Sequence, residues 1–210
     1  MENVTDVWYG PLPAGSPYVK PLRLHYVRNG VEKFWDLVDV QDSVCIIIYN
    51  KTTNKLVFVK QFRPAVYYGV IKEMGCKHDD KIELEKYPAK LGITLELCAG
   101  TVDKNLPLNE IAREEVLEEC GFNVPVDRLE TVMTHKSGVG ASGANMTMFY
   151  CEVTEVDKVN SGGGVDDEII DVIELSMDEV KEMVKQGAKN ISPPACLLGI
   201  LWFLHNKCPK

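Results

Sequence analysis

The sequence has 210 residues, of which 45% are hydrophobic and 26% charged, an ordinary composition for a soluble globular protein. Its formal net charge is -8 and its pI is about 5.1, which argues against partners that need a basic surface, such as nucleic acid or an anionic membrane. No apolar run reaches the roughly 18 residues of a membrane span. An anionic small substrate remains possible, because a bound divalent metal reverses the local charge.

Seven cysteines are scattered along the chain without a CxxC pair. Four of them lie in apolar runs, where a free thiol behaves as a small hydrophobic side chain. This pattern predicts a reduced, cytoplasmic protein rather than a disulfide scaffold.

The N-terminal part predicts a β-hairpin, because the Asn29-Gly30 turn lies between the strand-like runs 18–27 and 31–40. It follows a stretch rich in proline and glycine. The expected organisation is a loose arm, a small β-subdomain, a main domain and a short tail, over residues 1–15, 16–41, 42–206 and 207–210.

The main domain combines strand-like runs with few helices, which favours an α/β or α+β fold. The segments 74–92 and 156–167 are polar and glycine-containing, and are expected as loops. Helices are predicted from Pro107 to Gly121, from the capping box at Ser176, and from Ser192-Pro193. The predicted strands are 43–49, 55–62, 94–98, 129–134, 146–153 and 168–174.

The first of these helices carries carboxylates where its periodicity expects apolar residues. Glu115, Glu118 and Glu119 continue a stripe that starts with Leu108, Ile111 and Ala112 and ends with Phe122. Buried carboxylates repel one another and are costly unless a cation compensates, and a hard divalent metal would do so. The pattern by itself leaves a solvated acidic face open, with Val116 and Leu117 turned to the core.

Residues 100–122 resemble the Nudix box, GX5EX7REUXEEXGU. Two positions depart from the pattern: Leu106 stands where glutamate is usual, and Glu114 where arginine is usual. The matching positions are Gly100, Glu115, Val116, Glu118, Glu119, Gly121 and Phe122.

The resemblance implies a Nudix α/β/α sandwich with a mixed sheet, and Mg²⁺-dependent hydrolysis of a nucleoside diphosphate linked to another group. Mn²⁺ is a possible substitute for Mg²⁺. By position in the box, Glu115 and Glu119 would be the principal metal ligands. Glu118 would be a further ligand, directly or through water, and the backbone carbonyl of Ala99 would complete the set.

A general base is expected from an acidic loop after the box. Asp166, Asp167 and Glu168 follow three glycines and occupy the corresponding place in the subfamily that acts on ADP-ribose and sugar nucleotides. Glu168 is the preferred base, with the two aspartates as competitors. A plain solvated loop is the alternative to a loop that closes over the metals.

Substrate contacts are expected from three further segments. Gln61 and Arg63 resemble the QxR segment of the same subfamily, and the planar Arg63 guanidinium suits a phosphate. Glu96 matches the glutamate ahead of the box and would support the metal or phosphate site. The third segment is the glycine-rich loop 137–143, with Ser137, Gly138 and Gly140 as candidates.

The pattern as a whole is most similar to the animal UDP-sugar diphosphatase group, which implies hydrolysis of UDP-glucose to UMP and glucose 1-phosphate. Gly138 and Gly143 stand near the places where ADP-ribose hydrolases carry a proline and a glutamate. An ADP-ribose pyrophosphatase, giving AMP and ribose 5-phosphate, is the alternative within the family. A non-catalytic Nudix-fold nucleotide-binding module is the alternative of another class.

The resemblance also implies a homodimer that shares its N-terminal β-subdomain. Residues 16–41, with Phe34 and Trp35 in the hairpin, fit that role, because a lone hairpin is only marginally stable. The alternative is that the hairpin packs on its own domain.

Overall fold

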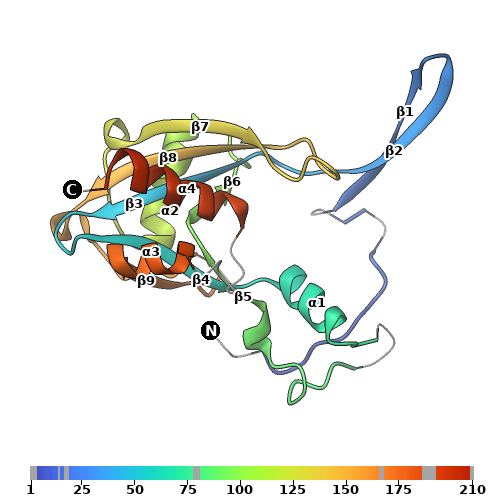
Figure 1. The fold of residues 1–210 in the computed structure, drawn as a ribbon, viewed down its shortest axis with the longest axis horizontal. Coiled ribbons are helices and arrows are strands. Elements are labelled where there is room, and N and C mark those ends of the chain that lie inside the picture. The colour runs from blue at the N-terminus through green and yellow to red at the C-terminus, as the bar shows by residue number, and fades with distance from the viewer. Residues whose placement is uncertain are drawn as a thin grey trace.

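The computed structural model describes residues 4–13, 15–16, 19–77, 81–165, 168–185 and 193–208. A seven-stranded mixed sheet lies between helices, and a separate two-stranded ribbon projects from one end of this body (Figure 1). The ribbon consists of β1 (Lys20–Arg28) and β2 (Val31–Asp39). The sheet strands are β3 (Ser43–Asn50), β4 (Lys55–Phe62), β5 (Ile93–Glu96), β6 (Cys98–Thr101), β7 (Glu130–Lys136), β8 (Asn145–Val153) and β9 (Asp171–Ser176). The helices are α1 (Pro64–Glu73), α2 (Leu108–Cys120), α3 (Met177–Lys185) and α4 (Pro194–Asn206), with 3-10 turns at Ala89–Gly92, Val126–Arg128 and Glu155–Asp157.

The sheet is built around β3. Its path runs β5-β4-β3-β8-β7, while β6 pairs with β3 and β9 pairs with β4. β3 and β8 run parallel over their whole length, from Ser43 opposite Met146 to Asn50 opposite Val153. The other pairs in this sheet are antiparallel. β3 is therefore a central strand, and its residues from Val44 to Tyr49 are buried.

Alternate residues of the central strands supply two cores. Ile46 and Ile48 of β3 face α2 and pack with Val116 of that helix. Ile47 faces the other way and packs with residues of α3 and α4, among them Phe203. In Figure 1, α2 lies behind the sheet and α4 in front of it. The predicted α/β/α sandwich with a mixed sheet is confirmed.

The three predicted helices form close to their expected positions. α2 starts after Pro107 and ends at Gly121, whose φ of 74° places the C-cap in the left-handed region. Ser176 and Glu179 exchange hydrogen bonds at the start of α3, as a capping box does. α4 begins at Pro194, after Pro193 in the cap position.

Two details of the predicted pattern are wrong. Leu108, expected on the inward stripe of α2, is 38% exposed, because the core face of the helix is centred on Val116 and Cys120. The carboxylates lie along the edge of this face. In addition, α1 was not among the predicted helices.

α1 has its own small core, which also alters the expected loop 74–92. Tyr67 and Ile71 of α1 are buried against Ile82 and Tyr87, and the Tyr67 hydroxyl donates to the Tyr87 carbonyl. The N-terminal arm has no helix or strand in its described residues, but Val7 packs against this cluster and accepts a hydrogen bond from the Ile82 amide. The expected loop therefore contains buried side chains.

The ribbon confirms the predicted Asn29-Gly30 turn, with φ of 54° and 74° at the two residues. Its side chains are mostly exposed to solvent. It is joined to the main body by hydrogen bonds from the Val38 amide to the Ala141 carbonyl and from the Trp35 indole to the Gly140 carbonyl. Within the described ranges, no helix has both the length and the apolar character needed to cross a membrane.

The packing of α4 generates a first prediction. A Cβ added at Gly199 would lie 2.7 Å from Leu97 Cδ1 and 3.1 Å from Ile47 Cγ1. Gly199→Val should therefore lower the free energy of unfolding by about 1–3 kcal/mol, measured by urea denaturation. Leu198→Val controls for the effect of a β-branched residue in the same helix. An unchanged midpoint for Gly199→Val would contradict the close approach.

Candidate active site

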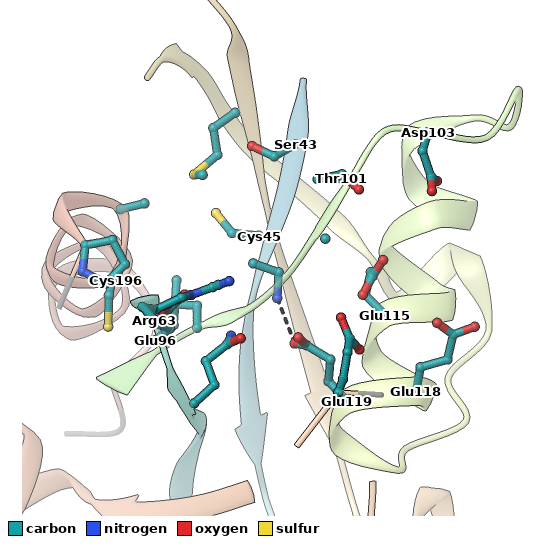
Figure 2. Close-up of a pocket in the computed structure, with 18 of the residues that line it drawn as sticks. Ser43, Cys45, Arg63, Glu96, Thr101, Asp103, Glu115, Glu118, Glu119 and Cys196 are labelled. Carbon is teal, nitrogen blue, oxygen red and sulfur yellow. Dashed lines mark hydrogen bonds and ion pairs between the residues drawn. The ribbon is translucent and has the colours of Figure 1, made fainter. Parts of the chain in front are cut away.

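A cavity of about 640 Å³ opens between the edge of the sheet, α2 and the start of α4. Figure 2 shows the glutamates of α2 on one wall and Arg63, Glu96 and Cys196 on the opposite wall. The cavity brings together most of the residues predicted from the sequence. These are Gln61, Arg63, Glu96, Ala99, Glu115, Glu118, Glu119 and Glu168.

Glu119 is the most buried of the α2 carboxylates, with 3% of its surface exposed. Its Oε2 accepts a hydrogen bond of 2.9 Å from the Ala99 amide of β6 (Figure 2). Glu115 lies close against the next residue of β6, since a Cβ added at Gly100 would be 1.9 Å from Glu115 Oε1. Gly100 therefore leaves the space beside β6 that the Glu115 side chain occupies.

Burial and mutual repulsion disfavour the charged forms of these groups. Desolvation, with the nearby Glu118 and Glu168, raises the pKa of Glu115 to about 7. Desolvation also raises the pKa of Glu119 to about 8, with further contributions from Glu115 and Glu168, against the opposing effect of the Ala99 amide. Glu119 therefore does not lie on a solvated acidic face.

The donor set suits a hard cation. Glu115 and Glu119 present carboxylate oxygens to one cavity, Glu118 lines it as well, and a divalent ion would remove the electrostatic cost of ionising them. Across the described ranges, no three His, Cys, Asp or Glu side chains are yet arranged to hold a metal ion. Because the Glu119 carboxylate is bonded to the Ala99 amide, side-chain rotation would accompany binding.

The opposite wall carries a fixed cation. Arg63 donates from Nε and Nη2 to the two oxygens of Glu96, at 2.8 and 2.7 Å. Thr94 Oγ1 donates to Glu96 Oε1 at 2.6 Å. Burial would raise the pKa of Glu96, but the bonds from Arg63 and Thr94 hold it below the usual value. Glu96 is thus an orienting partner that fixes the plane of the Arg63 guanidinium.

The segment that leads to Glu168 is attached to the end of α2. The amides of Gly163 and Gly164 donate to the carbonyls of Glu119 and Glu118, at 2.9 and 3.1 Å. A Cβ at Gly162 would lie 2.2 Å from the Glu119 carbonyl oxygen, so this approach requires glycine there. Glu168 lines the cavity, and its Oε2 accepts from the Val165 amide at 3.3 Å. Asp166 and Asp167 lie outside the described residues.

The glycine-rich loop is not among the residues that line the cavity. Ser137, Gly138 and Gly140 lie between β7 and β8, where the Ser137 amide donates to the Ala144 carbonyl and Gly140 accepts the Trp35 indole N–H. The loop therefore contacts the base of the ribbon. Its predicted role in substrate binding stays a prediction.

Several lining residues escaped the sequence analysis. Lys104 is the most informative, because it lies inside the box and its Nζ is 2.7 Å from Glu114 Oε2. The spacing of the box gives no signal for this contact, because it depends on how the loop folds back onto α2. The remaining additions are Ser43, Cys45, Leu97, Thr101, Asp103, Met146, Val165, Pro193, Ala195 and Cys196, while Gly100 was already part of the box match.

The raised pKa values predict a pH-dependent stability in the absence of metal. Glu119 loses its proton near pH 4.5 in the unfolded chain but near pH 8 in the fold, so the folded protein holds the extra proton between these values. This proton uptake adds to the free energy of unfolding below pH 4.5. The added stability, a few kcal/mol, is lost as the pH rises through 8. Urea denaturation in EDTA from pH 5 to 9 measures this. Glu119→Gln should flatten the profile and the surface variant Glu130→Gln should not; an equally steep profile for Glu119→Gln would contradict the assignment.

Comparisons with known proteins identify the family of the chain. No family model matches the chain. It is 39% identical to the uridine diphosphate glucose pyrophosphatase NUDT14 of Bos taurus, over 100% of this chain and 98% of the relative, and equally to that of Mus musculus. It is also 29% identical to the GDP-mannose pyrophosphatase of Enterobacter sp. (strain 638), over 72% of this chain and 69% of the relative. Full-length similarity at this level, with the carboxylate helix and cavity in place, means that the chain belongs to the Nudix hydrolase family, among its sugar-nucleotide pyrophosphatases.

Proposed function

We propose that this protein hydrolyses the pyrophosphate bond of UDP-glucose to give UMP and glucose 1-phosphate. The observation that carries the proposal is the placement of the buried Glu119 and the half-buried Glu115 on α2 opposite the oriented Arg63 across a single cavity. The full-length similarity to two uridine diphosphate glucose pyrophosphatases supports the choice of substrate.

The residues fit a magnesium site. Glu115 and Glu119 would hold Mg²⁺, or Mn²⁺ in its place, with Glu118 as a direct or water-mediated ligand and the Ala99 carbonyl beside them. When bound, the metal neutralises the phosphate oxygens and lowers the pKa of a water. The protein itself keeps the carboxylates desolvated and close together, so they bind a cation more strongly than exposed glutamates would.

Arg63 would bind a phosphate of the substrate. Its Nε and Nη2 each donate to Glu96, and the other guanidinium N–H groups remain for phosphate oxygens. A guanidinium held in one plane loses little rotational freedom on binding. Gln61 lines the same wall and would supply a neutral hydrogen bond.

Glu168 would act as general base. A water attacks one phosphorus, its proton passes to the Glu168 carboxylate, and the bond from that phosphorus to the bridging oxygen breaks. Glu168 lines the cavity near Glu115 and Glu119, as its influence on their pKa values indicates. Asp166 and Asp167 remain the competing candidates for the base.

The setting of the enzyme is also part of the proposal. The seven cysteines are scattered along the chain without a CxxC pair, which supports a reducing, cytoplasmic location. The ribbon supports a homodimer, because Leu22, Leu24 and Tyr26 share one face with the cross-strand partners Leu37 and Trp35. Leu24, Trp35 and Leu22 are 54%, 54% and 43% exposed, and a second copy of the ribbon would cover them.

The proposed reaction is tested with the purified protein, Mg²⁺ and a panel of UDP-glucose, GDP-mannose, ADP-glucose and ADP-ribose, with products identified by chromatography. We expect UMP and glucose 1-phosphate from UDP-glucose. Glu119→Gln should lower kcat/KM by about 100-fold or more, because it removes a charged ligand. Glu130→Gln, far from the cavity on β7, should match the wild type.

Other outcomes would change the assignment. No nucleoside monophosphate from any substrate would favour a binding module without catalysis. Rapid ADP-ribose cleavage with inert UDP-glucose would overturn the substrate. Near-normal turnover by Glu119→Gln would overturn the metal site.

The dimer is tested by light scattering. We expect twice the 23.5 kDa chain mass for the wild type. Leu24→Glu should shift the protein toward the monomer, because it places a charge on the apolar face of the ribbon. Val27→Glu is the matched control on the opposite face. A wild type that is monomeric at all concentrations, or equal effects of both variants, would contradict the proposal.

A further inference from the structure

An ion pair joins the box loop to α2 at the place where the sequence departs from the Nudix pattern. Lys104 Nζ lies 2.7 Å from Glu114 Oε2, and Arg113 Nη2 lies 3.8 Å from the other oxygen of that carboxylate. Leu106 makes no comparable contact and is 42% exposed. The two unusual residues therefore differ: Glu114 has a charged partner, while Leu106 faces solvent.

The charges of this pair are reversed relative to the pattern. The box pattern calls for an acid in the loop, at position 106, and a base on the helix, at position 114. This chain has a base in the loop, Lys104, and an acid on the helix, Glu114. The loop and the helix of this chain are therefore joined by an ion pair whose acid lies on the helix and whose base lies in the loop.

The loop is short and joins the two elements that meet at the cavity. At its start the Val102 amide donates to the Asp42 carbonyl, and at its end the Pro107 carbonyl accepts from the first turn of α2. Lys104 lies in the middle of the loop and contacts Glu114 of α2. β6 before the loop carries Ala99 and Gly100, and α2 after it carries Glu115, whose carboxylate lies against Gly100.

We propose that Lys104 is a positioning residue: by pairing with Glu114 it holds the box loop on α2 and sets the spacing between the Glu115 carboxylate and the Ala99 carbonyl. This rests on the metal site of the proposed function. The pairing raises the pKa of Lys104 and lowers that of Glu114, so both partners stay charged at neutral pH.

Two simpler accounts make different predictions. Ion pairs that are partly exposed, as here with 48% and 26% of the side chains accessible, often contribute little to stability, which predicts no effect of removing Lys104. A purely Coulombic account predicts tighter metal binding without Lys104, because a nearby ammonium repels a divalent cation. Only a positioning role predicts weaker metal binding once the lysine is lost.

The experiment measures Mn²⁺ binding to the full chain by calorimetry, without substrate. Lys104→Met should weaken binding about tenfold, as loss of an outer contact to a metal site does. Lys104→Arg should keep near wild-type affinity. Arg113→Met also removes a cation beside Glu114, but one that belongs to the helix itself, and should change the Kd less than about twofold.

A charge exchange gives the sharpest comparison. The variant Lys104→Glu should bind Mn²⁺ poorly, because two carboxylates then repel each other across the loop contact. The double variant, with Glu114→Lys added, should regain most of the affinity for Mn²⁺. Melting temperatures in EDTA confirm that each variant is folded. Unchanged or tighter binding by Lys104→Met overturns the proposal, and so does a double variant no better than Lys104→Glu.

The results that would overturn the role of Lys104 differ from those that would overturn the metal site. If Glu119→Gln binds Mn²⁺ as tightly as the wild type, the metal site itself is wrong. If Glu119→Gln loses binding while Lys104→Met retains it, the metal site stands and only the role of Lys104 is overturned.

Discussion

The carboxylate of Glu119 has lost nearly all contact with water, and the hydrogen bond from the Ala99 amide is the contact that ties it to β6. The Ala99 amide and the Cys98 thiol do not replace the hydration of a charge, so desolvation raises the pKa of Glu119 to about 8. Glu115 and Glu168 add further negative charge nearby. The cavity is therefore electrostatically incomplete by itself, and a divalent cation would complete it.

This constraint organises the surrounding structure. Glycine at position 100 permits β6 to approach Glu115, and the glycines at 162–164 permit the acidic loop to dock on the carbonyl end of α2. Arg63 lies across the cavity, where it donates two hydrogen bonds to Glu96 and is also attracted by Glu119 and Glu168. Arg63 and the α2 carboxylates lie on opposite walls, so each could bind its own part of a metal-bound diphosphate.

The sandwich fold, three of the four α-helices in the described residues, and most residues of the carboxylate wall could be predicted from the sequence. These have strong local signals: a helix with caps at both ends and a long, fixed spacing of glutamates. α1 was not predicted although Tyr67, Val70 and Ile71 have helical spacing, and its burial depends on Ile82 and Tyr87, which come later in the chain. The partner of Glu114 was missed because it depends on how the loop at Lys104 folds back onto the helix. The loop 137–143 could not be placed, since its distance from the cavity is set by the pairing of β7 with β8.

The parallel pairing of β3 with β8 also has a consequence for the order of assembly. Ser43 pairs with Met146, so the centre of the sheet closes only after a long intervening segment has been made. The wall of the cavity at Pro193 and Cys196 comes from α4, near the end of the chain. Contacts between such distant segments form slowly because loop closure costs entropy. During synthesis, the carboxylate helix exists before the part of the opposite wall that Pro193 and Cys196 supply, so the cavity is completed only after that later segment has been made.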